Sequence, residues 1–332
     1  MTYASICSIG AYVPNKVMTN SDFESIIETT DEWISSRTGI KTRYIADKDE
    51  ATSDLAARAC EQAIQRAGIN PCDVDMLICA TITPDYLCMP STACIVADKL
   101  GLKNIAAFDI SAACSGFVYG LSIAKAFIES GMKKCVLVIG AETLSRILDY
   151  TDRTTCVLFG DGAGAAVVCA TQDENRRIVD INISADGEYR DFLITPGGGS
   201  RFPCSQYVLD ERLNYIKMKG NSTFKVAVKT LSADIQQMLQ RTSLSADDID
   251  YFIPHQANLR IIQAVGDSIG LPSEKIVLTV EKYGNTSAAS IPMAMNQAFE
   301  DGRLKDGSLI LLNAFGGGLT WGSALLYFGG KS

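Results

Sequence analysis

A thiol that could act as a nucleophile lies where a predicted strand ends and a predicted helix begins. Cys114 follows the apolar run of residues 106–110 and precedes a helical pattern. The unpaired N–H groups and the positive dipole end of a helix N-terminus stabilise a thiolate. The small neighbours Ala112, Ala113 and Gly116 leave room for a substrate. The alternative is a structural role, which we assign to the other cysteines as small, buried apolar side chains.

The only histidine of the chain and one asparagine lie at the starts of two further helical patterns. His255 directly follows the strand pattern of residues 251–253, and α/β proteins often bind ligands in such strand-to-helix loops. Asn285 follows Gly284, which gives the backbone freedom at that point. A neutral imidazole is useful in catalysis but is not committed to one role. Taken singly, His255 could be a structural histidine and Asn285 a helix cap.

Two glycine-rich segments could bring backbone N–H groups close to a ligand. Phe315–Gly318 lies between two apolar runs, where it could approach a substrate oxygen or simply form a tight turn. Gly160–Gly164 (GDGAG) is followed by AAVVCA, which is typical of a strand. A nucleotide-binding loop requires a helix at that point, so this function is excluded.

Strand patterns alternate with helical patterns around these residues. Apolar β-rich runs predict buried strands, and polar starts with glycine ends delimit helices. The predicted strands are residues 76–83, 106–110, 135–139, 165–169 and 309–312, and the predicted helices are residues 53–67, 115–130, 221–240 and 287–300. This alternation indicates an α/β fold with helices on both faces of a sheet.

A polar segment, Thr171–Arg177, divides the chain near its middle. We therefore predict two α/β halves, residues 1–172 and residues 173–332. One stretch of the second half, Ser308–Gly330, has no charged residue and could suggest a membrane span. Its three consecutive glycines weaken a helix, so we expect two buried strands around a turn and no membrane span.

The amino-acid composition limits the classes of protein to which the chain can belong. The chain has 332 residues, of which 47% are hydrophobic and 20% charged, so it can form a full core as a soluble globular enzyme. A net charge of -8 argues against non-specific nucleic-acid binding. Eleven scattered cysteines with one histidine offer no zinc motif, so no metal is expected. The absence of a signal-peptide pattern at the start, together with the free thiols, indicates a reducing cytoplasm.

Three separated segments resemble one enzyme family, β-ketoacyl-acyl-carrier-protein synthase III of the thiolase-like superfamily. They are residues 112–116 (AACSG), 254–260 (PHQANLR) and 284–289 (GNTSAA). Residues 20–39, 159–166 and 314–324 match the same family in order and spacing, so the resemblance covers nearly the whole chain. It implies a thiolase-like fold: two similar α/β halves with mixed sheets packed in layers (αβαβα).

Related condensing enzymes differ in their reactive residues. Elongating ketoacyl synthases pair their cysteine with two histidines, and this chain has one. Thiolases use a second cysteine in a C-terminal glycine-rich segment, and no cysteine follows Cys204 here. The remaining set of cysteine, histidine and asparagine is that of synthase III and of plant polyketide synthases, and the segment 256–260 (QANLR) favours the former.

The resemblance implies a decarboxylating Claisen condensation that initiates fatty acid synthesis. Cys114 would take the acyl group of acetyl-CoA or a similar primer, and malonyl-acyl carrier protein would then enter and lose CO₂. His255 and Asn285 would donate hydrogen bonds to the enolate oxygen, and the backbone N–H groups of Cys114 and Gly317 would bind the second oxyanion. No cofactor is required, because CoA thioesters and the carrier protein are substrates.

The resemblance also implies substrate contacts and a homodimer. Trp33, Arg37 and Arg153 match CoA contacts, although Thr154 stands where many relatives have glycine. Met89 falls where the family often has an aromatic residue that crosses the dimer interface and closes the partner's acyl pocket. The residues implied in carrier-protein binding are Gln256, Ala257, Asn258, Leu259, Arg260 and Lys225, with Lys217, Lys219 and Lys229 adding positive charge for an acidic carrier.

Three other functions fit parts of the sequence. A condensing enzyme of a specialised pathway, or an acyltransferase of the same fold, would use another acceptor. A thioesterase with the same three residues would need the histidine to deprotonate the cysteine or a water molecule. A binding protein without activity would need no reactive thiol.

Overall fold

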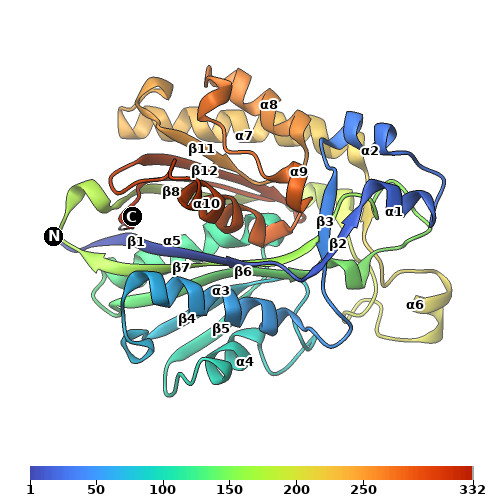
Figure 1. The fold of residues 1–332 in the computed structure, drawn as a ribbon, viewed down its shortest axis with the longest axis horizontal. Coiled ribbons are helices and arrows are strands. Elements are labelled where there is room, and N and C mark those ends of the chain that lie inside the picture. Colours follow the sequence, from blue (N-terminus) through green and yellow to red (C-terminus); the bar gives the residue numbers. More distant parts are fainter. Residues whose placement is uncertain (331–332) are drawn as a thin grey trace.

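Two mixed β-sheets form the framework of the protein (Figure 1). The structure is a computed structural model that describes residues 1–330. The first sheet has the strand order β1-β7-β6-β4-β5 and the second the order β11-β12-β13-β8. The strands of the first sheet are β1 (Tyr3–Tyr12), β4 (Met76–Ala80), β5 (Ala106–Ile110), β6 (Cys135–Thr143) and β7 (Asp161–Thr171). Those of the second sheet are β8 (Ile178–Ala185), β11 (Tyr251–Pro254), β12 (Leu309–Gly316) and β13 (Thr320–Tyr327).

The two sheets share one topology. In the first sheet β7 runs antiparallel between β1 and β6, and β6 runs parallel to β4. In the second sheet β13 runs antiparallel between β8 and β12, and β12 runs parallel to β11. The strands of the first sheet end at Thr171 and those of the second begin at Ile178, so the boundary predicted near residue 173 lies between them. The division into two domains stays a prediction, because one hydrophobic core joins the halves.

Helices complete five layers (Figure 1). Helices α3 (Thr52–Ala67) and α4 (Thr92–Lys99) pack on the outer side of the first sheet. Helices α5 (Gly116–Glu129) and α10 (Ser290–Glu300) lie between the two sheets. Helices α7 (Gly220–Thr242) and α8 (Leu259–Ser268) cover the second sheet. The predicted αβαβα layering is therefore confirmed.

Short elements connect the layers and border the site described below. A two-stranded sheet pairs β2 (Lys16–Thr19) with β3 (Thr42–Ile45), and another pairs β9 (Leu193–Ile194) with β10 (Lys217–Met218). The remaining helices are α1 (Asn20–Glu24), α2 (Asp31–Thr38), α6 (Gln206–Asp210) and α9 (Val280–Tyr283). The 3₁₀ turns are Pro71–Asp73, Ala113–Ser115, Leu144–Ile147, Glu174–Arg176, Gly187–Phe192, Ala246–Asp248, Ser273–Lys275 and Ser287–Ala289.

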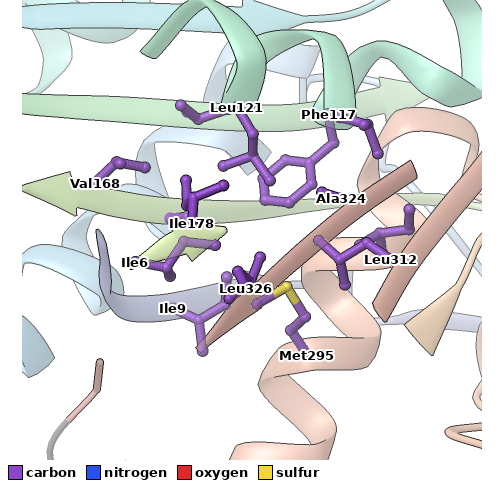
Figure 2. Packing of buried hydrophobic residues seen from close by; sticks show 14 of the residues in the cluster. Ile6, Ile9, Phe117, Leu121, Val168, Ile178, Met295, Leu312, Ala324 and Leu326 are labelled. Atoms are coloured by element: carbon purple, nitrogen blue, oxygen red, sulfur yellow. The ribbon is translucent and has the colours of Figure 1, made fainter. Parts of the chain in front are cut away.

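The central core lies between the sheets and draws on both halves. Figure 2 shows Phe117 and Leu121 of α5 among side chains of both sheets, including Ile6 of β1 and Leu326 of β13. These four side chains are fully buried, and each contributes about 1.5–3 kcal/mol through removal of apolar surface from water. Their burial fixes the spacing between the sheets.

Most predicted elements are confirmed, with two differences at their ends. The strand predicted over residues 76–83 ends at Ala80, because Thr81 and Thr83 leave the sheet and bond to the Glu142 carboxylate. The helix predicted over residues 287–300 opens with a 3₁₀ turn, and α10 proper begins at Ser290.

The uncharged C-terminal segment forms the expected pair of strands. Its residues belong to β12 and β13, which pair across the glycine turn. Among residues 1–330, no helix combines the length and the apolarity that crossing a bilayer requires.

Replacement of Gly140 by alanine should destabilise the protein by about 1–3 kcal/mol. A Cβ at this position of β6 would collide with the backbone of Ala288 and lie 2.9 Å from the Ala289 nitrogen. Urea denaturation measures the change in the free energy of unfolding. The control is Gly187→Ala, since a Cβ there meets nothing within 4 Å; it should shift stability by no more than about 0.5 kcal/mol. Equal effects of the two substitutions would contradict the close backbone contact.

Candidate active site

Cys114, His255 and Asn285 line one cavity of about 540 Å³. Cys114 follows β5 in the first half, whereas His255 follows β11 and Asn285 follows α9 in the second half. The three residues are only 5%, 7% and 7% exposed. The fold therefore brings together the three residues that the sequence singled out, in a site largely shielded from water.

The Cys114 backbone is held in a tight turn against the glycine loop of the other sheet. Ala113 has a left-handed φ of 46°, and the turn leads directly into α5. A Cβ at Gly316 would lie 2.6 Å from the Cys114 nitrogen, so only glycine permits this approach. Gly316 lines the cavity, and Gly317 lines a second cavity that Cys114 also borders. Cys114 thus lines both cavities.

Burial dominates the electrostatics of the thiol. It raises the pKa of Cys114 to about 12, and the Glu142 carboxylate adds to this shift. The Ser287 hydroxyl and the backbone N–H of Cys114 oppose it. The helix N-terminus is present as the sequence predicted, but the thiol is nevertheless protonated at neutral pH, because removal from water disfavours the charged form more strongly.

His255 is neutral in this environment. Burial lowers the pKa of its imidazole to about 3, so the ring is uncharged throughout the physiological range. Its backbone N–H donates to the Asn313 carbonyl at 2.8 Å, and its Nδ1 lies 2.6 Å from the Ser290 Oγ. The position of the ring is therefore fixed by the backbone bond of His255 and by the contact of its Nδ1 with Ser290.

Gln256 fixes the loop that carries the histidine. Its Nε2 donates to the carbonyls of Pro254 and Val277, and its Oε1 accepts from the N–H groups of Thr279 and Val280. Its side chain is 1% exposed, and these four bonds satisfy the whole amide. The Gln256 side chain therefore supports the loop, and its predicted contact with a carrier protein stays a prediction.

The Asn285 side chain has one end free to donate. Its Oδ1 accepts from the Ser287 N–H at 2.9 Å, so the Nδ2 group is the end of the amide available to a ligand. Its backbone is fixed by bonds of 2.9 and 3.0 Å with Leu158 and Gly160 of the first half. Asn285 is thus positioned by the half of the chain that carries Cys114.

Aromatic and cationic side chains lie at the mouth of the cavity. Trp33 and Arg37 both line it, and the Arg37 guanidinium lies 4.6 Å from the centre of the Trp33 ring. The guanidinium of Arg153 lies 5.2 Å from the same ring and donates to the Glu28 carbonyl. Arg37 already covers a face of the indole, so an adenine between them would displace the guanidinium.

A basic rim borders the same opening. Lys225 and Arg260 are exposed and line the cavity, and the Arg260 guanidinium lies 5.9 Å from the ring centre of Phe224. Asn258 caps α8 and donates to the Arg37 carbonyl at 3.0 Å. Ala257 and Leu259 are half-buried beside it. The predicted carrier-binding segment is therefore accessible mainly at Arg260.

A second cavity, of about 1170 Å³, is also lined by Cys114. Most of the surface that lines this cavity is apolar and includes the side chains of Leu144, Phe159 and Ile216. Leu87 and Cys88 line this cavity, whereas the neighbouring Met89 is 81% exposed. Met89, which is predicted to close an acyl pocket, thus does not line the cavity of its own chain.

Glu142 is a site residue that sequence analysis missed. Its carboxylate is fully buried at the end of β6 and accepts from the Thr83 hydroxyl at 2.6 Å and from the Ile82 N–H at 3.1 Å. Burial raises its pKa to about 7. No sequence motif marks this residue, because its partners come from the loop after β4.

Metal ligands are not gathered anywhere in the described chain. Across residues 1–330, no group of three or more histidine, cysteine, aspartate or glutamate side chains is arranged to hold a metal ion. The polar groups that line the first cavity with Cys114 include the His255 imidazole and the Asn285 amide, whose N–H groups suit an oxyanion.

Comparison with known proteins agrees with this geometry. The sequence family described as 3-oxoacyl-[acyl-carrier-protein (ACP)] synthase III matches residues 108–187, and the family described as its C-terminal part matches residues 239–328. The chain is 65% identical to the β-ketoacyl-[acyl-carrier-protein] synthase III of Aliarcobacter butzleri, with 99% of this chain and 98% of the relative covered. It is 55% identical to that of Campylobacter jejuni, with both chains covered completely.

Solved structures show the same fold. The 3-oxoacyl-(acyl carrier protein) synthase III of Pseudomonas aeruginosa superposes with a TM-score of 0.92 at 40% identity, covering 99% of both chains. The 3-oxoacyl-[acyl-carrier-protein] synthase III of Aquifex aeolicus superposes with a TM-score of 0.90 at 45% identity, covering 98% of this chain and 100% of the Aquifex chain.

Fold and site together define a condensing enzyme of the thiolase-like class. More narrowly, the chain belongs to the β-ketoacyl-acyl-carrier-protein synthase III family. It is an acyltransferase of fatty acid synthesis, as the resemblance of its motifs implied.

Replacement of Glu142 by glutamine should lower the pKa of Cys114. The carboxylate disfavours the thiolate, and it is charged mainly above its own pKa of about 7. Alkylation of Cys114 by iodoacetamide, followed by mass spectrometry between pH 7 and 10, should therefore be faster in the variant, with the difference growing as the pH rises. Glu129→Gln, at the far end of α5, is the control. Unchanged or slower alkylation at pH 9 would refute the electrostatic coupling.

Proposed function

We propose that Cys114 is acylated by acetyl-CoA or a similar primer and that the acyl group is then condensed with malonyl-acyl carrier protein. The observation that carries this proposal is that Cys114 lines two cavities, one of which is also lined by the neutral donors His255 and Asn285. An acyl chain bound to Cys114 can occupy the apolar second cavity. CoA can meanwhile leave the first cavity, and the malonyl thioester of the carrier protein can enter it.

The first step exchanges one thioester for another. The Cys114 sulfur attacks the acyl-CoA carbonyl, the bond to the CoA sulfur breaks, and the thiol proton leaves with CoA as its free thiol. The raised pKa of Cys114 makes this proton transfer part of the step. No charged group on the protein has to form beforehand.

The second step uses the two neutral donors. Loss of CO₂ from the malonyl group leaves an enolate, whose oxygen accepts from His255 and from the Nδ2 group of Asn285. The enolate carbon attacks the acyl-Cys114 carbonyl, and the oxyanion formed there accepts from the backbone N–H groups of Cys114 and Gly317. The carbon–sulfur bond then breaks to release 3-oxoacyl-acyl carrier protein, and the thiolate takes up a proton.

The substrates and partners follow from the rim of the first cavity. Lys225 and Arg260 offer positive charge to an acidic carrier protein, with Ala257, Asn258 and Leu259 beside them. Trp33, Arg37 and Arg153 offer the adenine of CoA an aromatic face and two guanidinium groups. No separate cofactor or metal enters these steps, and the reaction would take place in the cytoplasm.

We further propose a homodimer. Tyr86, Leu87 and Met89 are 57%, 72% and 81% exposed on one loop, close to the second cavity that Leu87 lines. A partner subunit would bury this apolar loop and would bring Met89 to the acyl pocket of the other subunit. The flexible methionine side chain would then form one end of that pocket.

A specialised-pathway condensing enzyme is the second candidate. The priming β-ketosynthase of the R1128 polyketide pathway superposes with a TM-score of 0.92 at 33% identity. The relatives at 55–65% identity carry the name β-ketoacyl-acyl-carrier-protein synthase III, which favours primary fatty acid synthesis. The thioesterase is less favoured, because it needs the histidine as a base and the imidazole pKa is about 3.

His255→Ala and Asn285→Ala should separate the two steps. Each removes one donor to the enolate, so CO₂ release from malonyl-carrier protein should fall by about a hundred-fold or more. Formation of radiolabelled acetyl-Cys114 from acetyl-CoA should change little, since neither donor is used in that step. Rapid loss of the label to water in the unaltered enzyme would contradict the proposal and favour a thioesterase.

Reversal of the rim charges should weaken use of the carrier protein. The double variant Lys225→Glu, Arg260→Glu should raise KM for malonyl-carrier protein by about tenfold at low salt, and less at high salt. Malonyl-pantetheine, which lacks the protein, should be used as before. Lys103→Glu, an exposed lysine outside the rim, is the matched control. An unchanged KM for the carrier protein would favour the second candidate.

A further inference from the structure

One hydroxyl group joins the catalytic imidazole to the helix behind it. Ser290 Oγ lies 2.6 Å from His255 Nδ1 and 3.3 Å from the backbone nitrogen of Gln256. Ser290 is 2% exposed and His255 is 7% exposed, so water does not compete for these groups. Neither the sequence motifs nor the two proposed steps assign a role to Ser290.

The hydrogen-bond inventory decides which ring nitrogen carries the proton. A backbone N–H can only donate, so the Ser290 oxygen acts as acceptor toward Gln256. The serine hydrogen is then left to find an acceptor, and His255 Nδ1 is the one within hydrogen-bond distance among residues 1–330. If Nδ1 carried the proton instead, the buried serine hydrogen would have no partner, which is costly.

The position of Ser290 in the fold also favours an unprotonated Nδ1 on His255. It is the first residue of α10, an eleven-residue helix, and the positive end of a helix dipole favours a lone pair over a proton on a nearby atom. Gln256 holds the opposite side of the loop through its four amide bonds. The imidazole therefore has little freedom to turn or to change partners.

We propose that Ser290 is a positioning residue that donates to Nδ1 of His255 and thereby fixes the proton on Nε2. This inference deepens the proposed function and rests on it. With its proton on Nε2 and its Nδ1 lone pair engaged by Ser290, the imidazole can donate to the enolate oxygen but cannot accept the thiol proton of Cys114. Ser290 thus restricts the histidine to the second step.

The tautomer can be observed directly, because His255 is the only histidine of the chain. The untagged protein, labelled with ¹⁵N-histidine, should give one pair of imidazole signals at neutral pH: a protonated Nε2 and an unprotonated Nδ1. A protonated Nδ1 would overturn the inference whatever the enzyme's activity. The same measurement leaves the proposed function untouched, so that the two can fail separately.

The variant Ser290→Ala tests the consequence for catalysis. Without the hydroxyl donor, both tautomers should become populated, and the rate of condensation should fall by about tenfold, the worth of one neutral hydrogen bond. Acetylation of Cys114 should stay within about twofold, since that step does not use the ring. An equal loss in both steps, or an unchanged tautomer, would overturn the inference.

Two further variants separate positioning from simple packing. Ser290→Thr keeps the hydroxyl and should retain the Nε2–H tautomer and most of the condensation rate. Ser8→Ala removes another buried hydroxyl, which donates to the Ala63 carbonyl at 2.6 Å far from the cavity. It should leave both the tautomer and the ratio of the two rates unchanged. A shift in that ratio for Ser8→Ala equal to that for Ser290→Ala would contradict a specific role of Ser290.

Discussion

The site depends on backbone packing directly against backbone where the two halves meet. Gly140 leaves room for the turn that begins at Ser287, and Gly316 leaves room for the turn that carries Cys114. Both turns contain a non-glycine residue with a left-handed φ, Ala113 at 46° and Ser287 at 48°. Such conformations persist only where the surrounding structure enforces them. The central helices α5 and α10 therefore start beside each other, with Cys114 before one and Ser290 at the start of the other.

The burial produced by this packing disfavours charge throughout the site. It raises the pKa of Cys114 to about 12 and that of Glu142 to about 7, and it lowers the pKa of His255 to about 3. The Cys114 thiol and the His255 imidazole are therefore neutral at rest, whereas Glu142 ionises near neutral pH. A decarboxylating condensation needs no charged base on the protein, because the malonyl group already carries a negative charge on its carboxylate. When CO₂ leaves, that charge remains on the enolate. Neutral hydrogen-bond donors that are already in position then stabilise the enolate.

The sequence predicted the framework and the three central residues, since these depend on local patterns. The strand over residues 106–110 agrees with β5 at both ends, and Cys114, His255 and Asn285 each stand beside a recognisable helix start. Contacts across the fold were not predictable. Glu142 meets Thr81 from 61 positions away, and Ser290 meets His255 from 35. The burial of Gln256 was not predictable either, because backbone groups of Pro254 and Thr279 satisfy its amide.

The central core has a consequence for how this enzyme tolerates change. The proposed nucleophile, Cys114, is carried by one half of the chain, and the two proposed enolate donors, His255 and Asn285, are carried by the other. The spacing between the two halves is set by core side chains such as Phe117 and Leu326, which line neither cavity. Repacking this interior would change the distance between Cys114 and the two donors, so substitutions in the core can alter the reaction rate without altering any residue of the cavity wall.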